Sequence, residues 1–405
     1  MEVYLDHAAA RPLDPRVAEA MAPYLAGRFG NPMSQHTHGY TAQADLEAAR
    51  ARVAALVGAA KPEEIVFTSG ATEANNLAVL GAGRRLASKG RHVVISAIEH
   101  ISLSTPVKAL AKEGFEVTTL PVDPEGRVDP QTLRENLRPD TVLVSVMYAN
   151  GEMGAIQRVA EIGAICRERG ILFHTDAVAA AGQVEIDVQR DKIDLLTLSS
   201  NDLYGPQGVG ALYVRQGVRL QPLLAGGGQE RGLRAGTQNL AGIVGFGRAA
   251  EIARQELPAE AARLAALRDA LLDGVLSRLT HAFVNGPREG RLPNNASIRV
   301  KFVEGEALLL GLNRAGIAAA SGSACTSVTL EPSHVLLAMG ISHVDAQGSV
   351  QFTLGRSNDQ AQIDHVIEQF PRVVHRLREM SPLNEHNEQE FAEESYEAFE
   401  HLHHH

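Results

Sequence analysis

The sequence predicts an α/β fold, with a large domain built on a mostly parallel, mixed sheet flanked by helices and a smaller α+β domain. Short apolar runs alternate with segments of helical periodicity from residue 65 to residue 214, and such alternation is typical of a parallel sheet. The 405 residues allow two or three domains. Apolar residues make up 44% and charged residues 21% of the chain, which is the usual balance of a globular protein. In such folds a ligand site is expected at the carboxyl ends of the strands.

The strands are predicted from apolar or β-branched runs that are bounded by polar or small residues. They cover residues 65–68, 92–96, 116–122, 141–147, 171–175, 195–198, 210–214, 296–300 and 349–354. The helices are predicted from apolar residues at helical spacing. They cover residues 14–25, 41–57, 102–113, 129–137, 159–169, 239–276, 305–315 and 359–380, and another opens at residues 69–76. Pro258 is expected to interrupt the long helix, because proline removes a helical hydrogen bond.

Three parts of the chain are predicted to differ in role. Residues 14–256 form the large domain, and residues 1–13 with 257–382 form the small domain. The tail from 383 to 405 is acidic and is expected to be disordered. It ends in the cluster His401-Leu-His-His-His405, which we interpret as the remnant of an added tag rather than a weak metal-binding tract.

Composition excludes several classes of function. The net charge of −10 argues against nucleic acid as a partner. No run of 18 apolar residues is present, so no membrane span is expected. The first residues lack a basic region followed by an apolar stretch, so no signal peptide is predicted. With only two cysteines, Cys166 and Cys325, the chain suits the reducing cytoplasm.

Two segments have the composition of a phosphate site. The run Thr68-Ser-Gly-Ala-Thr72 lies at a strand-to-helix junction, where free amides and the helix dipole favour an anion. The alternative is a plain N-cap by Ser69 or Thr72. The stretch from Asp194 to Val214 places two serines at the turn between two strands, which also suits a phosphorylated ligand.

Four further side chains are candidates for chemistry. His100 and Asp176 each follow a predicted strand; a buried carboxylate there needs a partner, whereas a lone histidine is more often a satisfied polar group. Cys325 lies among small residues, unlike Cys166, which lies in an apolar helix and is expected to be a buried small hydrophobe. Arg356 carries the guanidinium that suits bidentate binding of a carboxylate.

These segments resemble the cysteine desulfurases, which are pyridoxal-phosphate (PLP) enzymes of aminotransferase class V with the fold-type I architecture. The similar motifs occur in order over residues 2–382. They are Thr68-Ser-Gly-Ala-Thr-Glu73, Glu99-His100, Asp176, Tyr204-Gly-Pro206, Gly208-Val-Gly-Ala-Leu212, Ser321-Gly-Ser-Ala-Cys-Thr-Ser327 and Phe352-Thr-Leu-Gly-Arg356.

The resemblance implies a role for each matching residue. The cofactor-binding residues would be Ala71, Thr72, His100, Asn150, Asp176, Ser199, Asn201 and Thr237. His100 would stack on the pyridine ring, and Asp176 would protonate the ring nitrogen. Thr237, in the glycine-rich segment 225–237 that is alternatively a flexible connection, would reach the phosphate from the second subunit of a homodimer. Cys325 would carry sulfur as a persulfide, and Arg356 would bind the substrate carboxylate.

The sequence departs from the family on one side of the expected site. Asp202 replaces the lysine that holds the cofactor covalently, and Asn201 replaces a histidine. Ala179 and Gly151 stand where the family has a glutamine and a second asparagine near the phenolic oxygen. We therefore expect the departures to cluster, while the phosphate side is retained. Because a carboxylate cannot replace the covalent anchor, desulfurase turnover is expected to be very weak or absent.

Three functions follow from these expectations. The first is a cysteine desulfurase-like protein of iron–sulfur cluster assembly that docks a scaffold protein and offers Cys325 as persulfide carrier or transient cluster ligand. The second is an enzyme that binds PLP noncovalently, or its pyridoxamine form, and acts on L-cysteine or another amino acid. Asp202 would hold the amine of the cofactor or act as a base. The third is a non-catalytic structural subunit. His100 and Cys325 complete the predicted catalytic set.

Overall fold

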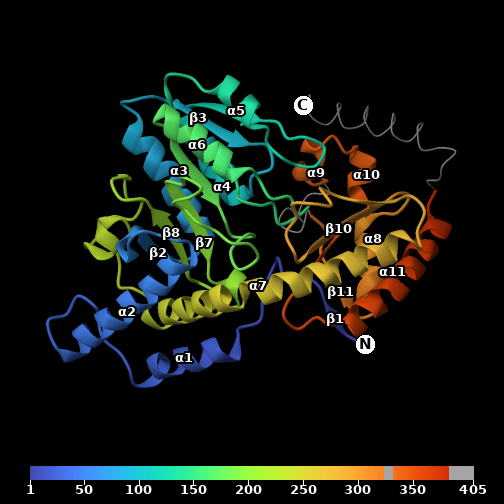
Figure 1. Cartoon of the computed structure of the whole chain (residues 1–405), viewed down its shortest axis with the longest axis horizontal. Helices are drawn as coiled ribbons and strands as arrows, with labels where there is room; N and C mark the ends of the chain where they lie inside the picture. The colour runs from blue at the N-terminus through green and yellow to red at the C-terminus, as the bar shows by residue number, and fades with distance from the viewer. Residues whose placement is uncertain (323–331, 383–405) are drawn as a thin grey trace. The chain divides into compact units, whose positions relative to one another are not determined.

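The computed structural model describes residues 1–322 and 332–382, and Figure 1 labels many of its helices and strands. The chain divides into two compact units. The larger unit contains Ala8–Gly151 and Ala155–Ala262. The smaller unit contains Met1–His7, Glu152–Gly154 and the described residues from 263 to 382. Each unit has at least one sheet of its own.

The larger unit is built on a seven-stranded sheet with the order β2-β8-β7-β6-β5-β3-β4. Its strands are β2 (Ile65–Thr68), β3 (His92–Ser96), β4 (Glu116–Leu120), β5 (Thr141–Ser145), β6 (Leu172–Asp176), β7 (Leu195–Ser199) and β8 (Gly210–Val214). The pairs from β4 through β7 are parallel, whereas β8 runs antiparallel to both β2 and β7. The predicted mostly parallel, mixed sheet is therefore confirmed.

Several helices of the larger unit begin at a residue whose side chain caps the helix. In chain order, the first helices of this unit are α1 (Pro15–Ala26), α2 (Thr37–Leu56), α3 (Ala71–Leu86), α4 (Ile101–Lys112), α5 (Pro130–Asn136) and α6 (Val159–Arg169). The side chain of Asp14 caps α1 and that of Asp129 caps α5, in each case just before a proline, which suits the first helical position. Helix α6 ends at Gly170, whose left-handed backbone suits glycine.

Helix α7 (Leu240–Leu276) begins in the larger unit and ends in the smaller one. The predicted interruption at Pro258 is wrong, because the helix continues through this residue. A proline inside a helix costs about 3 kcal/mol. Ile252 before the proline and Leu264, Leu271 and Leu272 after it are all buried. Burial of apolar side chains on both sides offsets this cost.

The smaller unit has a two-stranded and a three-stranded sheet. Strand β1 (Val3–Tyr4) pairs in parallel with β11 (Ile317–Ala318), and the larger sheet has the order β12 (Ser349–Thr353), β10 (Asn295–Val300), β9 (Ala282–Val284). Its helices after α7 are α8 (Gly305–Arg314), α9 (His334–Ala338), α10 (His343–Gln347) and α11 (Gln360–Met380). Strands β9 and β11 and helices α9 and α10 were not predicted, because segments this short show too little periodicity.

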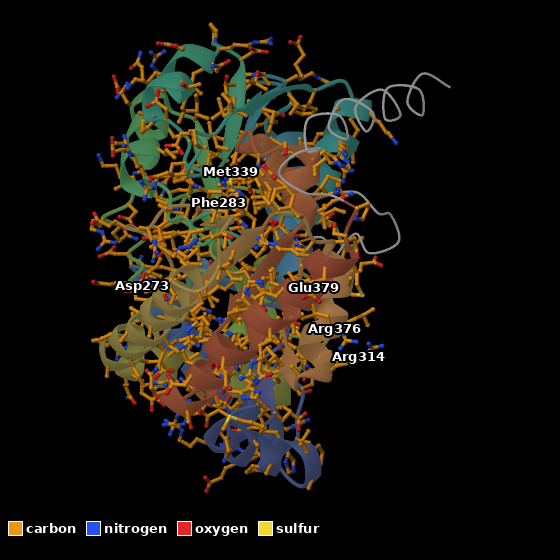
Figure 2. All side chains as sticks on the ribbon, turned by 90° about the vertical axis from the view of Figure 1, so that its right-hand side faces the viewer. Asp273, Phe283, Arg314, Met339, Arg376 and Glu379 are labelled. Carbon is orange, nitrogen blue, oxygen red and sulfur yellow. The ribbon has the colours of Figure 1, made fainter. Side chains whose placement is uncertain are left out.

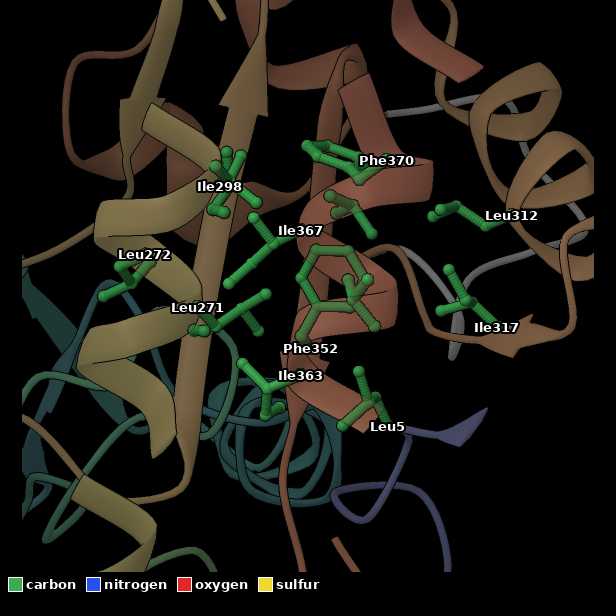
Figure 3. Packing of buried hydrophobic residues seen from close by; sticks show 14 of the residues in the cluster. Leu5, Leu271, Leu272, Ile298, Leu312, Ile317, Phe352, Ile363, Ile367 and Phe370 are labelled. Carbon is green, nitrogen blue, oxygen red and sulfur yellow. The ribbon is translucent and has the colours of Figure 1, made fainter. Parts of the chain in front are cut away.

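The core of the smaller unit lies between helices α7 and α11 and the strands β10 and β12 (Figure 3). Phe352 meets Phe370 edge to face, with ring centroids 5.5 Å apart. Leu271 and Ile367 extend this cluster. Such burial of large apolar side chains stabilises a core by about 1.5–3 kcal/mol for each side chain.

The opposite faces of these helices carry charged side chains. Helix α11 buries Ile363 and Phe370, whereas Arg376 and Glu379 are exposed near its end. Arg314, which ends the neighbouring helix α8, is exposed as well, and Figure 2 labels these charged residues. The division into apolar and charged faces is typical of surface helices.

No helix in the described part of the chain is long and apolar enough to span a bilayer.

Candidate active site

The carboxyl ends of the strands in the larger unit carry most of the residues that were predicted from the sequence. Thr68 ends β2, Asp176 ends β6 and Ser199 ends β7, while His100 and Asn150 follow β3 and β5. This edge of the sheet is where an α/β fold is expected to bind its ligand.

Helix α3 begins without a side-chain cap. Its N-cap residue is Gly70, with φ 156° and ψ 178°, and this residue makes no side-chain cap. Just before it, the Ser69 amide donates to Glu73 Oε2 at 2.7 Å. The alternative of a plain N-cap by Ser69 or Thr72 is therefore wrong. Gly210 packs tightly here, since a Cβ atom on it would lie 2.7 Å from Gly70 Cα. The uncapped amides and the helix dipole make this end suited to a phosphate group.

A chain of hydrogen bonds joins His100 to Asp176. Asn75 Nδ2 donates to Asp176 Oδ2 at 2.7 Å and to Ser102 Oγ at 2.9 Å. Ser102 Oγ lies 2.8 Å from His100 Nδ1, which also accepts from the Ser102 amide at 3.1 Å and so caps α4. Asp176 is buried, and its Oδ1 accepts from the Val178 amide at 2.9 Å. The network fixes a buried carboxylate and an exposed imidazole relative to each other.

Asn75 and Ser102 were not recognised from the sequence. Asn75 lies in the first turns of α3, and Ser102 lies in the first turn of α4. Polar residues near a helix start are usually explained as caps. Their position directly after two strands of one predicted sheet was the signal that would have identified them.

Glu99 is a buried carboxyl group beside His100. Its Oε1 accepts from Ser96 Oγ at 2.5 Å and from the Met147 amide at 2.8 Å. Burial raises the pKa of Glu99 to about 8, and the charge of Asp176 acts in the same direction, while both hydrogen bonds oppose the shift. The side chain is therefore mostly protonated at neutral pH.

We expect Glu99→Gln to change the pH dependence of stability. Folded Glu99 holds its proton up to about pH 8, whereas an unfolded glutamate loses it near pH 4.5. The contribution of Glu99 is therefore fully present below about pH 4.5 and is lost as pH rises toward 8, with a slope of at most about 1.4 kcal/mol per pH unit. Urea unfolding between pH 5 and pH 8 measures the slope, which Glu99→Gln should reduce and the exposed-site control Glu135→Gln should leave unchanged. Equal slopes for both variants and the natural protein would contradict this assignment.

Asp202 lies in a short 3₁₀ turn, Asn201–Leu203, directly after β7. Burial raises its pKa; the positive charge of Arg11 and a hydrogen bond from Ser199 oppose this, and the charge of Asp176 adds to the rise. Next to it, Asn201 Oδ1 and Ser200 Oγ are buried with no hydrogen-bond partner among the described residues. Buried polar atoms of this kind call for a ligand or water.

The two small departures from the family pattern adjoin each other. A Cβ atom added to Gly151 would lie 3.4 Å from Ala179 Cβ. The preceding residue, Asn150, is buried, and its Nδ2 donates to the Ile98 carbonyl at 3.2 Å. The expectation that the departures cluster therefore holds for this pair.

The loop that carries Thr237 is anchored by a buried ion pair. Glu230 accepts from Arg50 Nη1 at 2.6 Å and from Arg50 Nη2 at 3.0 Å, and it also accepts from the Phe67 amide at 2.9 Å. Glu230 and Arg231 have φ values of 46° and 57°, which are uncommon for residues other than glycine. Thr237 itself is exposed. The alternative of a simple flexible connection does not fit a loop that is anchored in this way.

The remaining candidates lie elsewhere. Cys325 and the histidine cluster of the tail are outside the described residues. Cys166 is buried in α6, and burial raises its pKa, which confirms it as a structural residue. Within the described ranges, no group of three or more His, Cys, Asp or Glu side chains is arranged to hold a metal ion.

Arg356 belongs to the smaller unit, where it follows β12. Its loop is held by Arg263, whose Nη1 donates to the Asn358 carbonyl at 2.6 Å and whose Nη2 donates to the Gly355 carbonyl at 3.1 Å. Asn358 Oδ1 in turn accepts from the Gly355 amide at 2.7 Å. Arg263 was not recognised from the sequence, because its partners lie about 90 residues further along the chain.

The fold and the residues at its sheet edge define a class of protein. Residues 3–366 match the family model of aminotransferase class V, and the chain belongs to that family. It is 52% identical over 380 residues to "Cysteine desulfurase IscS 1" from Archaeoglobus fulgidus, covering 94% of this chain and 99% of that protein. Two solved structures are also similar. A "NifS-like protein" has a TM-score of 0.87 and 36% identity, covering 93% of this chain and all (100%) of that one. "SspA in complex with cysteine" has a TM-score of 0.78 and 34% identity, covering 87% of this chain and 98% of that one.

The arrangement fits the cofactor of this family on one side, and on the other side Asp202 stands where the family resemblance places a lysine. An uncapped helix start, a fixed imidazole and a buried carboxylate suit the phosphate, ring face and ring nitrogen of PLP. Asn201 Oδ1 is buried with no hydrogen-bond partner among the described residues, and it marks the carboxyl end of β7 as a place for a further polar group. Asp202 cannot supply the amine that would bind the cofactor aldehyde.

Proposed function

We propose that this chain is a cysteine desulfurase-like protein of iron–sulfur cluster assembly whose ordinary turnover is impaired by Asp202. The family and the relatives named cysteine desulfurase support the general function. One observation supports the impaired turnover. Asp202 is a buried carboxylate at the position where the family resemblance places a lysine. Its raised pKa suits a proton-holding group and not a covalent anchor.

The cofactor-binding residues are proposed from the same resemblance. Thr72, Ser199 and the first amides of α3 would bind the phosphate of PLP, together with Thr237 of a second subunit. Asp176 would hold a proton at the ring nitrogen, and the exposed imidazole of His100 would orient the ring. Bound PLP supplies an electron sink for negative charge at the α-carbon of an amino acid. Arg356 would bind the carboxylate of that amino acid in a bidentate manner.

Cys325 is the proposed sulfur carrier. Its thiolate would attack the outer sulfur of an external persulfide, so that the donor leaves as a thiolate and Cys325 keeps the sulfur as its own persulfide. Cys325 would then offer this sulfur to a docked scaffold protein, or it would serve as a transient ligand of the cluster. A homodimer belongs to this proposal, because Thr237 would act from a second subunit. A cytoplasmic location belongs to it as well, because such thiol chemistry requires a reducing compartment.

Sulfide release from L-cysteine tests the proposed function. The pure protein is assayed with PLP and a thiol reductant, beside a desulfurase that has the lysine. Loss of a positioned acid–base group lowers rates about 10²–10⁴-fold, and loss of the covalent anchor adds to this, so we expect a deficit at least that large. Turnover at the rate of the lysine-containing enzyme would overturn the impairment.

Transfer of sulfur from a labelled persulfide donor tests the carrier role separately. We expect one labelled sulfur to reach the protein, and none to reach the Cys325→Ser variant. The matched control is Cys166→Ala, which removes the buried cysteine of α6. Labelling that survives in Cys325→Ser would exclude Cys325 as the carrier.

The second candidate is an enzyme that uses noncovalently bound PLP or its pyridoxamine form. The network from His100 to Asp176 favours it, because both groups are kept in a defined arrangement. Stoichiometric binding of pyridoxamine phosphate in calorimetry, without affinity for a scaffold protein, would support this candidate over the first. If neither cofactor nor scaffold binds, a structural subunit is left.

A further inference from the structure

The imidazole of His100 accepts hydrogen bonds at Nδ1. The backbone amide of Ser102 lies 3.1 Å from this nitrogen, and a backbone amide can only donate. The hydroxyl oxygen of Ser102 lies 2.8 Å from the same nitrogen. A ring nitrogen that accepts carries no proton, so neutral His100 has its proton on Nε2.

Asn75 fixes the direction of the Ser102 hydroxyl. The Asn75 side chain is fully buried, and its Nδ2 lies 2.7 Å from Asp176 Oδ2 and 2.9 Å from Ser102 Oγ. A reversed amide would place two acceptor oxygens against each other at Asp176, so the NH2 group faces both partners. Ser102 Oγ therefore accepts from Asn75, and its own hydrogen is directed to His100 Nδ1.

The other end of the Asn75 amide supports the same direction. Asn75 Oδ1 is buried and has no hydrogen-bond partner within residues 1–322 and 332–382. A buried acceptor without a partner is unfavourable, so the contribution of this side chain is its two N–H donors. Asp176 accepts from one of them and from the Val178 amide with different oxygens, which fixes the plane of its carboxylate.

We propose that Asn75 and Ser102 are positioning residues that hold His100 as the Nε2–H tautomer, so that its exposed imidazole offers a hydrogen-bond donor, and not a base, to a bound ligand. Asn75 donates to Asp176 on one side and, through Ser102, directs a donor to His100 on the other. A ligand group that meets His100 Nε2 is then an acceptor, such as a carboxylate, a thiolate or a phenolate oxygen. The inference deepens the proposed function, since the family resemblance assigns His100 and Asp176 to the cofactor ring.

Nitrogen NMR measures the tautomer of His100 directly. The full chain is labelled with ¹⁵N-histidine and recorded without cofactor at about pH 9, where an ordinary imidazole is neutral. The ring signals of His100 are identified by their absence in His100→Gln. We expect a protonated Nε2 and an unprotonated Nδ1. A protonated Nδ1 would overturn the proposal without the need for any further variant.

Asn75→Asp tests whether Asn75 sets the direction of these hydrogen bonds. The variant keeps nearly the same shape but supplies at most one donor, and beside Asp176 that single proton is shared between two carboxyl groups. The Ser102 hydroxyl then donates to the new carboxyl group, which leaves its oxygen free to accept from His100 Nδ1. We expect the ratio of Nδ1-protonated to Nε2-protonated His100 to rise about 2- to 10-fold, which corresponds to one hydrogen bond.

Asn76→Asp is the matched control, because it adds the same charge to the same helix. Asn76 is partly exposed, and its Nδ2 donates to the Thr72 carbonyl at 2.9 Å. An equal rise in both variants would show a general effect of charge and would overturn the role of Asn75. In a Ser102→Ala background the hydroxyl link is missing, so Asn75→Asp should no longer change the ratio, and a full rise there would exclude Ser102 as the link.

Asn75→Ala replaces Asn75→Asp if the latter does not fold. It also frees the Ser102 oxygen to accept, so a rise in the same direction is expected, and an unchanged ratio would overturn the role of Asn75. These spectra need no cofactor and no sulfide assay. Failure of the inference is therefore distinguishable from failure of the proposed function, which the sulfide and persulfide experiments decide.

Discussion

Replacing Arg50 with methionine is expected to lower the free energy of unfolding by about 3–5 kcal/mol. The side chains of Arg50 and Glu230 are 7% and 1% exposed, so the remaining carboxylate would be buried without its partner. Methionine keeps much of the apolar stem that packs near Phe67, over whose ring the guanidinium carbon lies at 4.9 Å. The lower free energy of unfolding therefore results mainly from the lost charge and hydrogen bonds. Urea unfolding monitored by circular dichroism measures it.

Arg52→Met provides the control for this experiment. Arg52 lies on the same helix, is 41% exposed and pairs with Glu251 at 3.6 Å. Exposed ion pairs contribute about 0–1 kcal/mol, so the control should change stability little. Similar small effects for both variants would contradict a dominant role for the buried pair.

The buried pair also holds the loop that carries Thr237, the residue that would reach the second subunit of the homodimer that we propose. Two successive residues with positive φ, Glu230 and Arg231, each cost about 1–3 kcal/mol when they are not held in place. Glu230 is held by Arg50 and the Phe67 amide, and Thr237 follows in the same loop. Arg50→Met should therefore release the strained turn before the rest of the unit unfolds. Faster amide exchange in residues 225–237 would report this release.

The sequence was informative where structure follows from local pattern. The parallel strands of the larger unit are apolar runs with clear bounds, and β2, β3 and β8 begin and end where they were predicted. The glycine between strand and helix and the polar residues after the strands likewise marked the candidate site. Local propensity and the burial pattern agree in these segments, which makes them predictable.

Features that depend on distant contacts were not predictable from pattern. Glu230 and Arg50 are 180 residues apart, and Asn75 and Asp176 are 101 residues apart. Neither pairing has a local signal, since charged and amide side chains are common on helix surfaces. Pro258 is a further example. Its local preference predicts a break in the helix, but burial on both sides of the proline overrides that preference and the helix continues. The departures at Gly151 and Ala179 adjoin only through the fold.

Asp176→Asn is expected to weaken binding of PLP about 10- to 100-fold. The carboxylate accepts from Asn75 Nδ2 and the Val178 amide with different oxygens, and asparagine has a single carbonyl oxygen for these donors. The neutral amide also cannot pair with a protonated ring nitrogen. A hydrogen bond to a charged group contributes about 1.5–3 kcal/mol, which corresponds to the stated loss of affinity. Isothermal titration of the pure protein with PLP measures it.

The control for Asp176→Asn is Asp191→Asn. Asp191 is a buried carboxylate of the same unit that accepts from the hydroxyl of Tyr148 at 3.0 Å and pairs with Arg190. Its replacement disturbs a buried charge without touching the network of His100 and Asn75. If Asp176→Asn binds PLP as tightly as the natural protein, the ring-nitrogen role of Asp176 is wrong. If both variants lose affinity equally, the loss reflects the stability of the unit, because only a specific role of Asp176 predicts a difference between two buried carboxylates.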